Sequence, residues 1–122
     1  MSRNITRTSA AVGLLFGAAS VIAGTRVLAG VDHPAYVVLT WLVEYNVAAG
    51  VVGVAAGAGL WMLRRSAVRL TMTLATCHGL VLVILLALLG TGQAVAMDSV
   101  RAMMLRTVVW SAIAFVTRRT TS

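Results

Sequence analysis

The chain of 122 residues is strongly apolar, with 60% hydrophobic residues, 11% charged residues and a mean hydropathy of +0.95. Soluble domains average about 45–50% apolar and about a quarter charged residues, and a soluble fold this small could not bury so much apolar surface. The net charge of +7 comes from ten arginines, without lysine, against three acidic residues. Because these arginines lie mostly at the ends of apolar runs, they fit membrane topology better than nucleic-acid binding. We therefore predict a single integral membrane domain over residues 1–122, in contact with the lipid bilayer.

Four apolar stretches, bounded by charged or turn residues, have the length and composition of transmembrane helices. They run roughly over Ser9–Gly30, Tyr36–Leu63, Ala67–Gly90 and Met97–Thr117. As a single helix the second stretch would be about 42 Å long, which exceeds the hydrocarbon core, so we expect it to tilt or protrude. The predicted fold class is all-α, a bundle of four transmembrane helices.

The arginines also predict the orientation of this bundle. If the helices alternate in direction, seven of the ten fall on one side: Arg3, Arg7, Arg64, Arg65, Arg69, Arg118 and Arg119. The other side holds Asp32 and Asp98, with Arg26 and Arg101. The positive-inside rule then places both termini in the cytoplasm. A lysine-free composition rich in Ala, Val, Gly and Arg indicates a GC-rich bacterial genome, hence a bacterial inner membrane.

The first stretch also allows a second interpretation. Arg3 and Arg7, followed by the apolar run Ala10–Gly24, fit a signal peptide with a cleavage site at Val27–Ala29. The length of the run and the position of Arg26 favour a retained helix. Cleavage would leave the orientation of the other three helices unchanged.

Two stripes of small residues predict close packing between the first two helices. The stripes are Gly13, Gly17, Ser20 and Gly24 in the first, and Asn46, Gly50, Gly53 and Gly57 in the second. Small residues let helix backbones approach each other closely in lipid. A ligand groove or a homodimer seam are the alternatives for one of the stripes.

Ionisable side chains inside the spans are costly and therefore candidates for function. Counted from the span midpoints, Glu44, Arg26 and Arg101 share a layer in the outer half of the bundle, with Asp98 one turn from Arg101. His78 and Arg106 lie deeper, near the middle of their helices.

From these depths we predict a buried salt bridge between Glu44 and Arg106, because Glu44 is the only acidic residue within reach. Asn46 and His78 would surround this bridge, and the Arg106 guanidinium could stack on the ring of Trp110. The candidate ligand-binding cluster comprises Glu44, Asn46, His78, Arg106 and Arg101. A purely structural role for the same residues stays open.

The chain shows no motif for catalysis or metal binding. Cys77 and His78 are neighbours that project about 100° apart on a helix, so one metal ion could not easily take both. His78 is the one histidine within a span, so a haem with two histidine ligands would need a second copy of the chain. We predict no catalytic residue and no metal site, and no bound cofactor, with quinone or haem as alternatives.

Several local phrases resemble the small four-helix DoxX-like bacterial membrane proteins. They are Gly13–Gly17, Tyr45-Asn46 with Gly50, His78-Gly79, and the run from Met97 through Arg106 to Trp110. The named members of that group resemble membrane subunits of quinone-linked sulfur oxidation, so the resemblance implies contact with quinone or a redox partner. It implies no set of site residues.

Together these features predict a small accessory or structural subunit, or a homo-oligomer, without catalytic activity of its own. The alternative is a binding or transport unit for a small lipophilic or anionic ligand such as quinone, or the membrane subunit of a redox complex.

Overall fold

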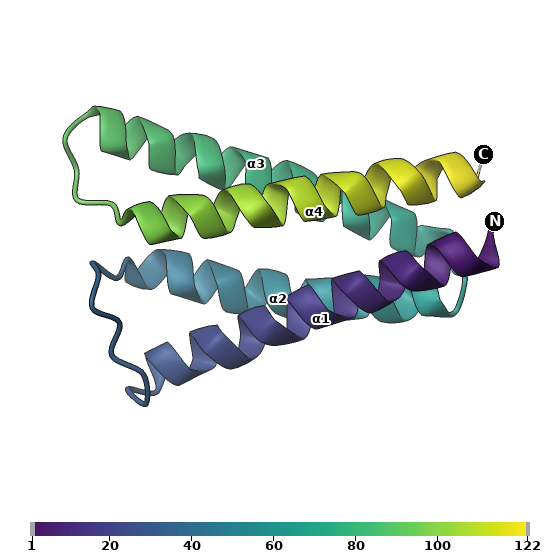
Figure 1. The fold of residues 1–122 in the computed structure, drawn as a ribbon, viewed down its shortest axis with the longest axis horizontal. Helices are drawn as coiled ribbons and strands as arrows, with labels where there is room; N and C mark the ends of the chain where they lie inside the picture. Colours follow the sequence, from purple (N-terminus) through teal and green to yellow (C-terminus); the bar gives the residue numbers. More distant parts are fainter. Residues whose placement is uncertain (1, 122) are drawn as a thin grey trace.

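The computed structural model describes residues 2–121, which form four α-helices joined by three connections (Figure 1). The helices are α1 (Arg3–Leu28), α2 (Thr40–Trp61), α3 (Ser66–Gly90) and α4 (Met97–Thr121). Each is long and apolar enough to cross a membrane, and the described residues contain no strand. The predicted all-α fold with four spans is confirmed.

The helices alternate in direction, so both termini lie at the same end of the bundle, beside the short α2–α3 connection (Figure 1). We call this the terminus end, and the opposite end, with connections 29–39 and 91–96, the loop end. α1 packs most closely on α2, and α3 packs on α4. α2 also contacts α3, and α1 contacts α4, so each helix packs against two neighbours.

The second residue of each connection lies in the left-handed region: Gly30 (φ 76°), Leu63 (φ 58°) and Gly92 (φ 84°). In each, the next amide donates back to a carbonyl in the last turn of the helix. The donor–acceptor pairs are Val31–Arg26 (2.9 Å), Arg64–Gly59 (2.9 Å) and Gln93–Leu88 (3.0 Å). This is the Schellman ending, which glycine adopts without strain. Leu63 adopts it at a cost of about 1 kcal/mol, and the chain turns between α2 and α3 within four residues.

The predicted helix boundaries need three corrections. α2 has 22 residues, or about 33 Å, instead of the 28 residues predicted for 36–63. Residues 36–39 are not helical, because Pro34 and the β-branched Val37 and Val38 disfavour a helix there. α1 begins at Arg3, six residues before the predicted start, and α4 continues to Thr121.

The interface between α1 and α2 is built on glycine, as predicted. A Cβ atom on Gly17 would lie 2.8 Å from the carbonyl oxygen of Gly50, and one on Gly50 would lie 2.8 Å from that of Gly17. At Gly57 it would lie 3.1 Å from the carbonyl oxygen of Ala10. The two backbones are therefore in direct contact, and only glycine fits where they cross.

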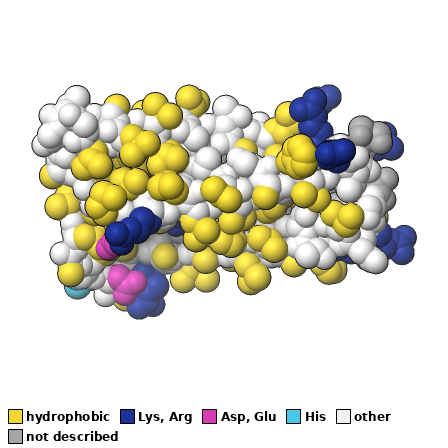
Figure 2. Space-filling model, turned by 45° about the horizontal axis from the view of Figure 1, so that its top comes forward, with side chains coloured by type: hydrophobic (Ala, Val, Ile, Leu, Met, Phe, Trp, Pro, Cys, Tyr) yellow, Lys and Arg dark blue, Asp and Glu magenta, His cyan; other side chains and the backbone are white. Residues whose placement is uncertain are grey.

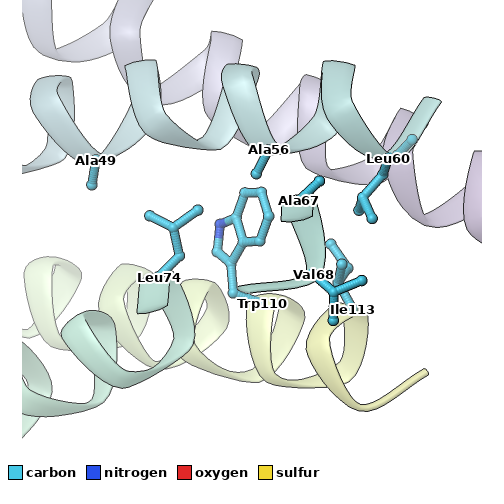
Figure 3. Close-up of a cluster of buried hydrophobic side chains, with 9 residues drawn as sticks. Ala49, Ala56, Leu60, Ala67, Val68, Leu74, Trp110 and Ile113 are labelled. Carbon is cyan, nitrogen blue, oxygen red and sulfur yellow. The ribbon is translucent and has the colours of Figure 1, made fainter. Parts of the chain in front are cut away.

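Trp110 of α4 fills the centre of the bundle. It is 3% exposed and belongs to a core cluster with residues of α1, α2 and α3. Figure 3 shows its indole ring reaching from α4 toward Ala56 of α2, with Leu74 of α3 beside it. Cβ atoms on Gly13 and Gly53 would lie 3.0 and 2.9 Å from the ring, so these glycines provide the room for it.

The outer surface is apolar along the helices and charged at the ends. Large side chains such as Leu15, Val83 and Val108 are 71%, 63% and 64% exposed. Figure 2 shows hydrophobic side chains over the middle of one face, arginines at the terminus end, and acidic groups beside arginines at the loop end. Such a surface is suited to lipid, which makes the chain a small multi-pass membrane protein.

Candidate functional site

Polar side chains from all four helices meet in the half of the bundle nearer the loop end. Nε of Arg106 (α4) donates to Oγ of Ser20 (α1) over 3.2 Å. The hydroxyl of Tyr45 (α2) and Nδ1 of His78 (α3) share a hydrogen bond of 3.0 Å. Arg106 is near enough to Tyr45 and His78 to interact electrostatically with both. The structure thus brings Arg106 and His78 into one polar layer, as their depths predicted.

The Tyr45–His78 pair connects α2 to α3. The two rings meet edge to face, with centroids 5.6 Å apart and planes at 89°. His78 is 2% exposed, and the shared hydrogen bond satisfies one of its ring nitrogens inside the core. This geometry fits a structural histidine that holds two helices together.

Arg106 is the charged group of this layer, and it has no carboxylate partner. Within residues 2–121 its one hydrogen bond is the contact from Nε to Ser20, and no acidic oxygen lies within 4.0 Å. Its two terminal nitrogens, Nη1 and Nη2, are therefore left with unused donors. A cation in this state inside a membrane-spanning bundle calls for an anion.

Arg106 lines a cavity of about 120 Å³ between α1, α2 and α4 at the loop end. Each helix contributes one face: on α1, for example, Ser20, Ala23, Gly24 and Val27 follow one another at helical spacing. Residues from the first connection, including Tyr36, complete the lining. The non-helical segment 36–39, which the sequence did not predict, therefore forms one wall.

Polarity within the cavity changes with depth. The innermost lining residues of the three helices are Ser20, Asn46 and Arg106. Ser20 lies eight residues before the end of α1, Asn46 lies six residues after the start of α2, and Arg106 lies nine residues after the start of α4. These separations correspond to about 9–13 Å from the helix ends. Nearer the loop end α1 and α2 contribute apolar side chains such as Val27, Leu42 and Val43, whereas α4 contributes Asp98 and Ser99. The cavity thus has a polar floor, formed by Ser20, Asn46 and Arg106, under walls that are apolar on α1 and α2 and polar on α4.

Asn46, which lines the floor, carries an unsatisfied acceptor that is itself buried. Oδ1 of Asn46 is buried and has no hydrogen-bond partner among the described residues. Across residues 2–121 the same holds for one other buried side-chain atom, Oγ1 of Thr6, near the terminus end. Buried polar atoms without a partner are rare and destabilising, and this oxygen has almost no surface open to the cavity that Asn46 lines.

The predicted salt bridge between Glu44 and Arg106 is wrong. Glu44 is exposed on the outside of α2, whereas Arg106 points into the bundle, and no ion pair of Glu44 occurs in the described structure. Glu44 and Asn46 are two residues apart and so point to different sides of the helix. The predicted outer layer, with Glu44 between Arg26 and Arg101, does not form either.

The arginines of that layer pair with aspartates at the loop end instead. Arg26 donates to both carboxylate oxygens of Asp32 over 3.0 and 3.1 Å. These hydrogen bonds and the positive charge hold the pKa of Asp32 below its ordinary value. Arg101 is exposed and lies 4.0 Å from Asp98, at the predicted spacing of three residues. Arg101 is not part of the cavity lining.

The predicted stacking of Arg106 on Trp110 is wrong. Arg106 does not stack on Trp110 in the described structure, because its guanidinium turns to Ser20 instead. No cluster of three or more His, Cys, Asp or Glu suitable for a metal ion occurs between residues 2 and 121.

Sequence reasoning missed two members of the site. Ser20 belongs to a predicted packing stripe, although it is the one hydroxyl among three glycines and so the one able to accept a hydrogen bond. Tyr45 precedes Asn46 and follows Leu42 by three residues, which places it on the inner side of α2. Both signals are present in the sequence. They identify Ser20 and Tyr45 as site residues only once the structure shows that Arg106 faces Ser20 and that His78 faces Tyr45.

Comparisons with protein-family models, curated proteins and solved structures find no match to this chain.

Proposed function

We propose that the chain binds, within a membrane, a small amphiphile whose anionic oxygen atoms pair with Arg106 on the floor of the loop-end cavity. The observation that carries this proposal is the guanidinium itself, which lines the cavity with Nη1 and Nη2 unpaired within the described chain. Carboxylate and phosphate groups match its planar donors well. The apolar walls that α1 and α2 contribute suit the lipophilic part of such a ligand.

A quinone is a second possible ligand, but it would bind Arg106 more weakly than an anion. A quinone carbonyl accepts hydrogen bonds from a guanidinium but carries no charge to compensate it. The resemblance to DoxX-like proteins implies contact with quinone or a redox partner, and the cavity supplies donors for such a carbonyl. The uncompensated charge of Arg106 favours an anion over a neutral carbonyl.

The binding experiment uses hexanoate, a short anionic amphiphile, because the cavity of about 120 Å³ would hold its head and part of its chain. Radiolabelled hexanoate is added to purified protein in dodecyl maltoside, and bound label is measured by scintillation proximity. We expect saturable binding that Arg106→Met weakens about tenfold or more, since it removes charged hydrogen bonds.

Arg101→Met is the matched control, because it removes the same charge from the same helix but outside the cavity. It should change hexanoate affinity less than about twofold, because an exposed charge contributes little. Equal losses in the two variants, or no saturable binding to the wild type, would overturn the proposal.

The proposed setting is a bacterial inner membrane with both termini in the cytoplasm. Its support is the seven arginines that the fold gathers near the terminus end, as the positive-inside rule requires of a cytoplasmic face. The cavity would then lie in the outer half of the bilayer. A C-terminal fusion to green fluorescent protein should fluoresce, and one to alkaline phosphatase should be inactive; the reverse pattern would contradict this orientation.

A second candidate function is that of an accessory subunit, in a homo-oligomer or a larger complex, redox or otherwise. One observation favours it: Glu44 lies exposed on α2 inside a predicted span, without a partner in the described chain. A carboxylate that faces lipid gains from a donor on another helix. Glu44→Gln should then loosen an assembly seen by native mass spectrometry, whereas a monomer in both forms would argue against this function.

A further inference from the structure

The cavity carries opposite charges at its two ends. Arg106 lies on the floor without a carboxylate partner in the described chain, and Asp98 lines the cavity nearer the loop end. Both belong to α4 and are eight residues apart, which corresponds to about 12 Å along the helix axis. No ion pair joins them among residues 2–121, so the two charges line one cavity without compensating each other.

Asp98 is available to a ligand because its pairing within the chain is weak. Its side chain is 61% exposed, and the one cationic group within 4.0 Å of it in the described chain is Nη1 of Arg101, at that distance. An exposed pair of this kind contributes little, so an ammonium group of a ligand can take the place of Arg101. Asp32 differs in both respects, because it accepts two hydrogen bonds from Arg26 and does not line the cavity.

We infer that the ligand is a zwitterion whose anionic group binds Arg106, whose ammonium group binds Asp98, and whose two ends are joined by a short alkyl chain. This inference rests on the proposed function and specifies its ligand class as the ω-amino carboxylic acids. The alkyl chain lies along the apolar walls of α1 and α2, which include Val27, Leu42 and Val43. A plain carboxylic acid of the same length fills the same space but leaves Asp98 unused.

The separation of the two charges limits the length of the ligand. The distance of about 12 Å along α4 separates backbone positions. Arg106 is near enough to Tyr36 of the first connection to interact with it electrostatically, so its guanidinium reaches toward the loop end and shortens the gap to Asp98. A cavity of about 120 Å³ is also too small for a long acyl chain. The alkyl chain between the two charged groups is therefore short.

The inference is tested with pairs of acids that differ by a terminal amino group. The amino acids 4-aminobutanoate, 6-aminohexanoate and 8-aminooctanoate are each compared with the plain acid of the same length. All compete against radiolabelled hexanoate on the full-length protein in dodecyl maltoside at neutral pH, where the amino group is charged. On the wild type we expect at least one amino acid to bind about fivefold more tightly than its plain counterpart, as one partly exposed ion pair allows.

Three variants assign this preference. Asp98→Asn removes the charge and keeps the shape of the side chain, so the ratio of the two affinities should fall to about one. Asp98→Glu keeps the charge and should retain a preference for the amino acid. Asp32→Asn is the matched control, because it removes the same charge at the same end of the bundle but outside the cavity, and the full preference should remain. Asp98 is exposed in the first turn of α4, so its variants should fold.

The outcomes separate the two proposals. Hexanoate binding that depends on Arg106, without a preference for the amino acid at any of the three lengths, would overturn the zwitterion inference and leave the proposed function standing. A preference that persists in Asp98→Asn, or that Asp32→Asn removes equally, would likewise overturn the zwitterion inference alone. Absence of Arg106-dependent binding for all the acids would overturn both proposals together.

Discussion

α1 meets its two neighbours in different ways. Toward α2 it presents Gly17 and Gly24, whose missing side chains allow contact with backbone atoms and with Val47. Toward α4 it presents Gly13 and Ser20, which face the long side chains of Trp110 and Arg106. One stripe of small residues therefore serves two purposes, because alternate members of it point to different helices.

The register on the α4 side explains where the cavity begins. Gly13 and Ser20 are seven residues apart on α1, and Trp110 and Arg106 are four apart on the antiparallel α4. Trp110 fills the space opposite Gly13 completely, whereas Arg106 opposite Ser20 reaches the edge of an open volume. The contact with α2 stays close from Gly57, opposite Ala10, to Gly24, opposite Val47. The cavity lies between α1, α2 and α4 nearer the loop end, so the α2 side provides the closest backbone contacts and both neighbours of α1 contribute to the candidate site.

The largest effect should come from filling the α1–α2 interface. Gly17→Leu places a side chain where a Cβ atom alone would lie 2.8 Å from the backbone of Gly50 and Val54. Backbone atoms cannot give way as side chains do, so we expect a loss of about 4 kcal/mol or complete misfolding. Stability is measured by SDS titration in mixed micelles.

Gly79→Ala is the control for this substitution. Its added methyl group would meet only Cγ2 of Thr107, at 4.0 Å. Alanine also favours a helix over glycine, so the variant should be as stable as the wild type or slightly more stable. A Gly17→Leu protein as stable as Gly79→Ala would contradict the packing described for α1 and α2.

On the α4 side the corresponding change is Trp110→Ala. It empties the centre of a cluster in which Trp110 is 3% exposed, and we expect a loss of about 3 kcal/mol. Gly13→Ala and Gly53→Ala should each be less harmful in this background than in the wild type, because the ring that they would crowd is gone. Strictly additive effects in the same SDS titration would show that these glycines do not serve to accommodate the ring.

The fold followed from the sequence much more completely than the site did. The four spans and the glycine contact between α1 and α2 depend on local composition and on spacing within one helix, which the sequence displays directly. The partner of Arg106 depends on the rotation of α2 about its axis. Glu44 and Asn46 point in directions about 200° apart around a helix. Their positions along the helix therefore did not decide which of the two faces Arg106. The stripe from Gly50 to Gly57 turns Asn46 inward and Glu44 outward, a consequence that becomes clear only with α1 in place.

A smaller effect, of opposite sign, should follow from removing the charge on the floor. Arg106 has no carboxylate partner in the described structure, so Arg106→Met should stabilise the ligand-free protein by about 1 kcal/mol. Glu44→Gln should leave stability within about 0.5 kcal/mol of the wild type, as expected for an exposed residue. Destabilisation by both changes, with recovery in the double variant, would instead reinstate a Glu44–Arg106 salt bridge.

The smallest effect concerns the end of α1, where Asp32 is paired with Arg26 and both side chains are about half exposed. Since this pairing lowers the pKa of Asp32 in the folded state, its contribution to stability is present above the ordinary pKa of an aspartate. It is lost as the pH falls through the lowered pKa, where the carboxylate takes up a proton. Asp32→Asn should therefore lower the melting temperature slightly at pH 6 and not at pH 2, as measured by tryptophan fluorescence. The pair is remote from both the glycine contact and the floor of the cavity, so hexanoate affinity should be the same in Asp32→Asn as in the wild type. A change in that affinity would mean that the first connection positions the site as well as enclosing it.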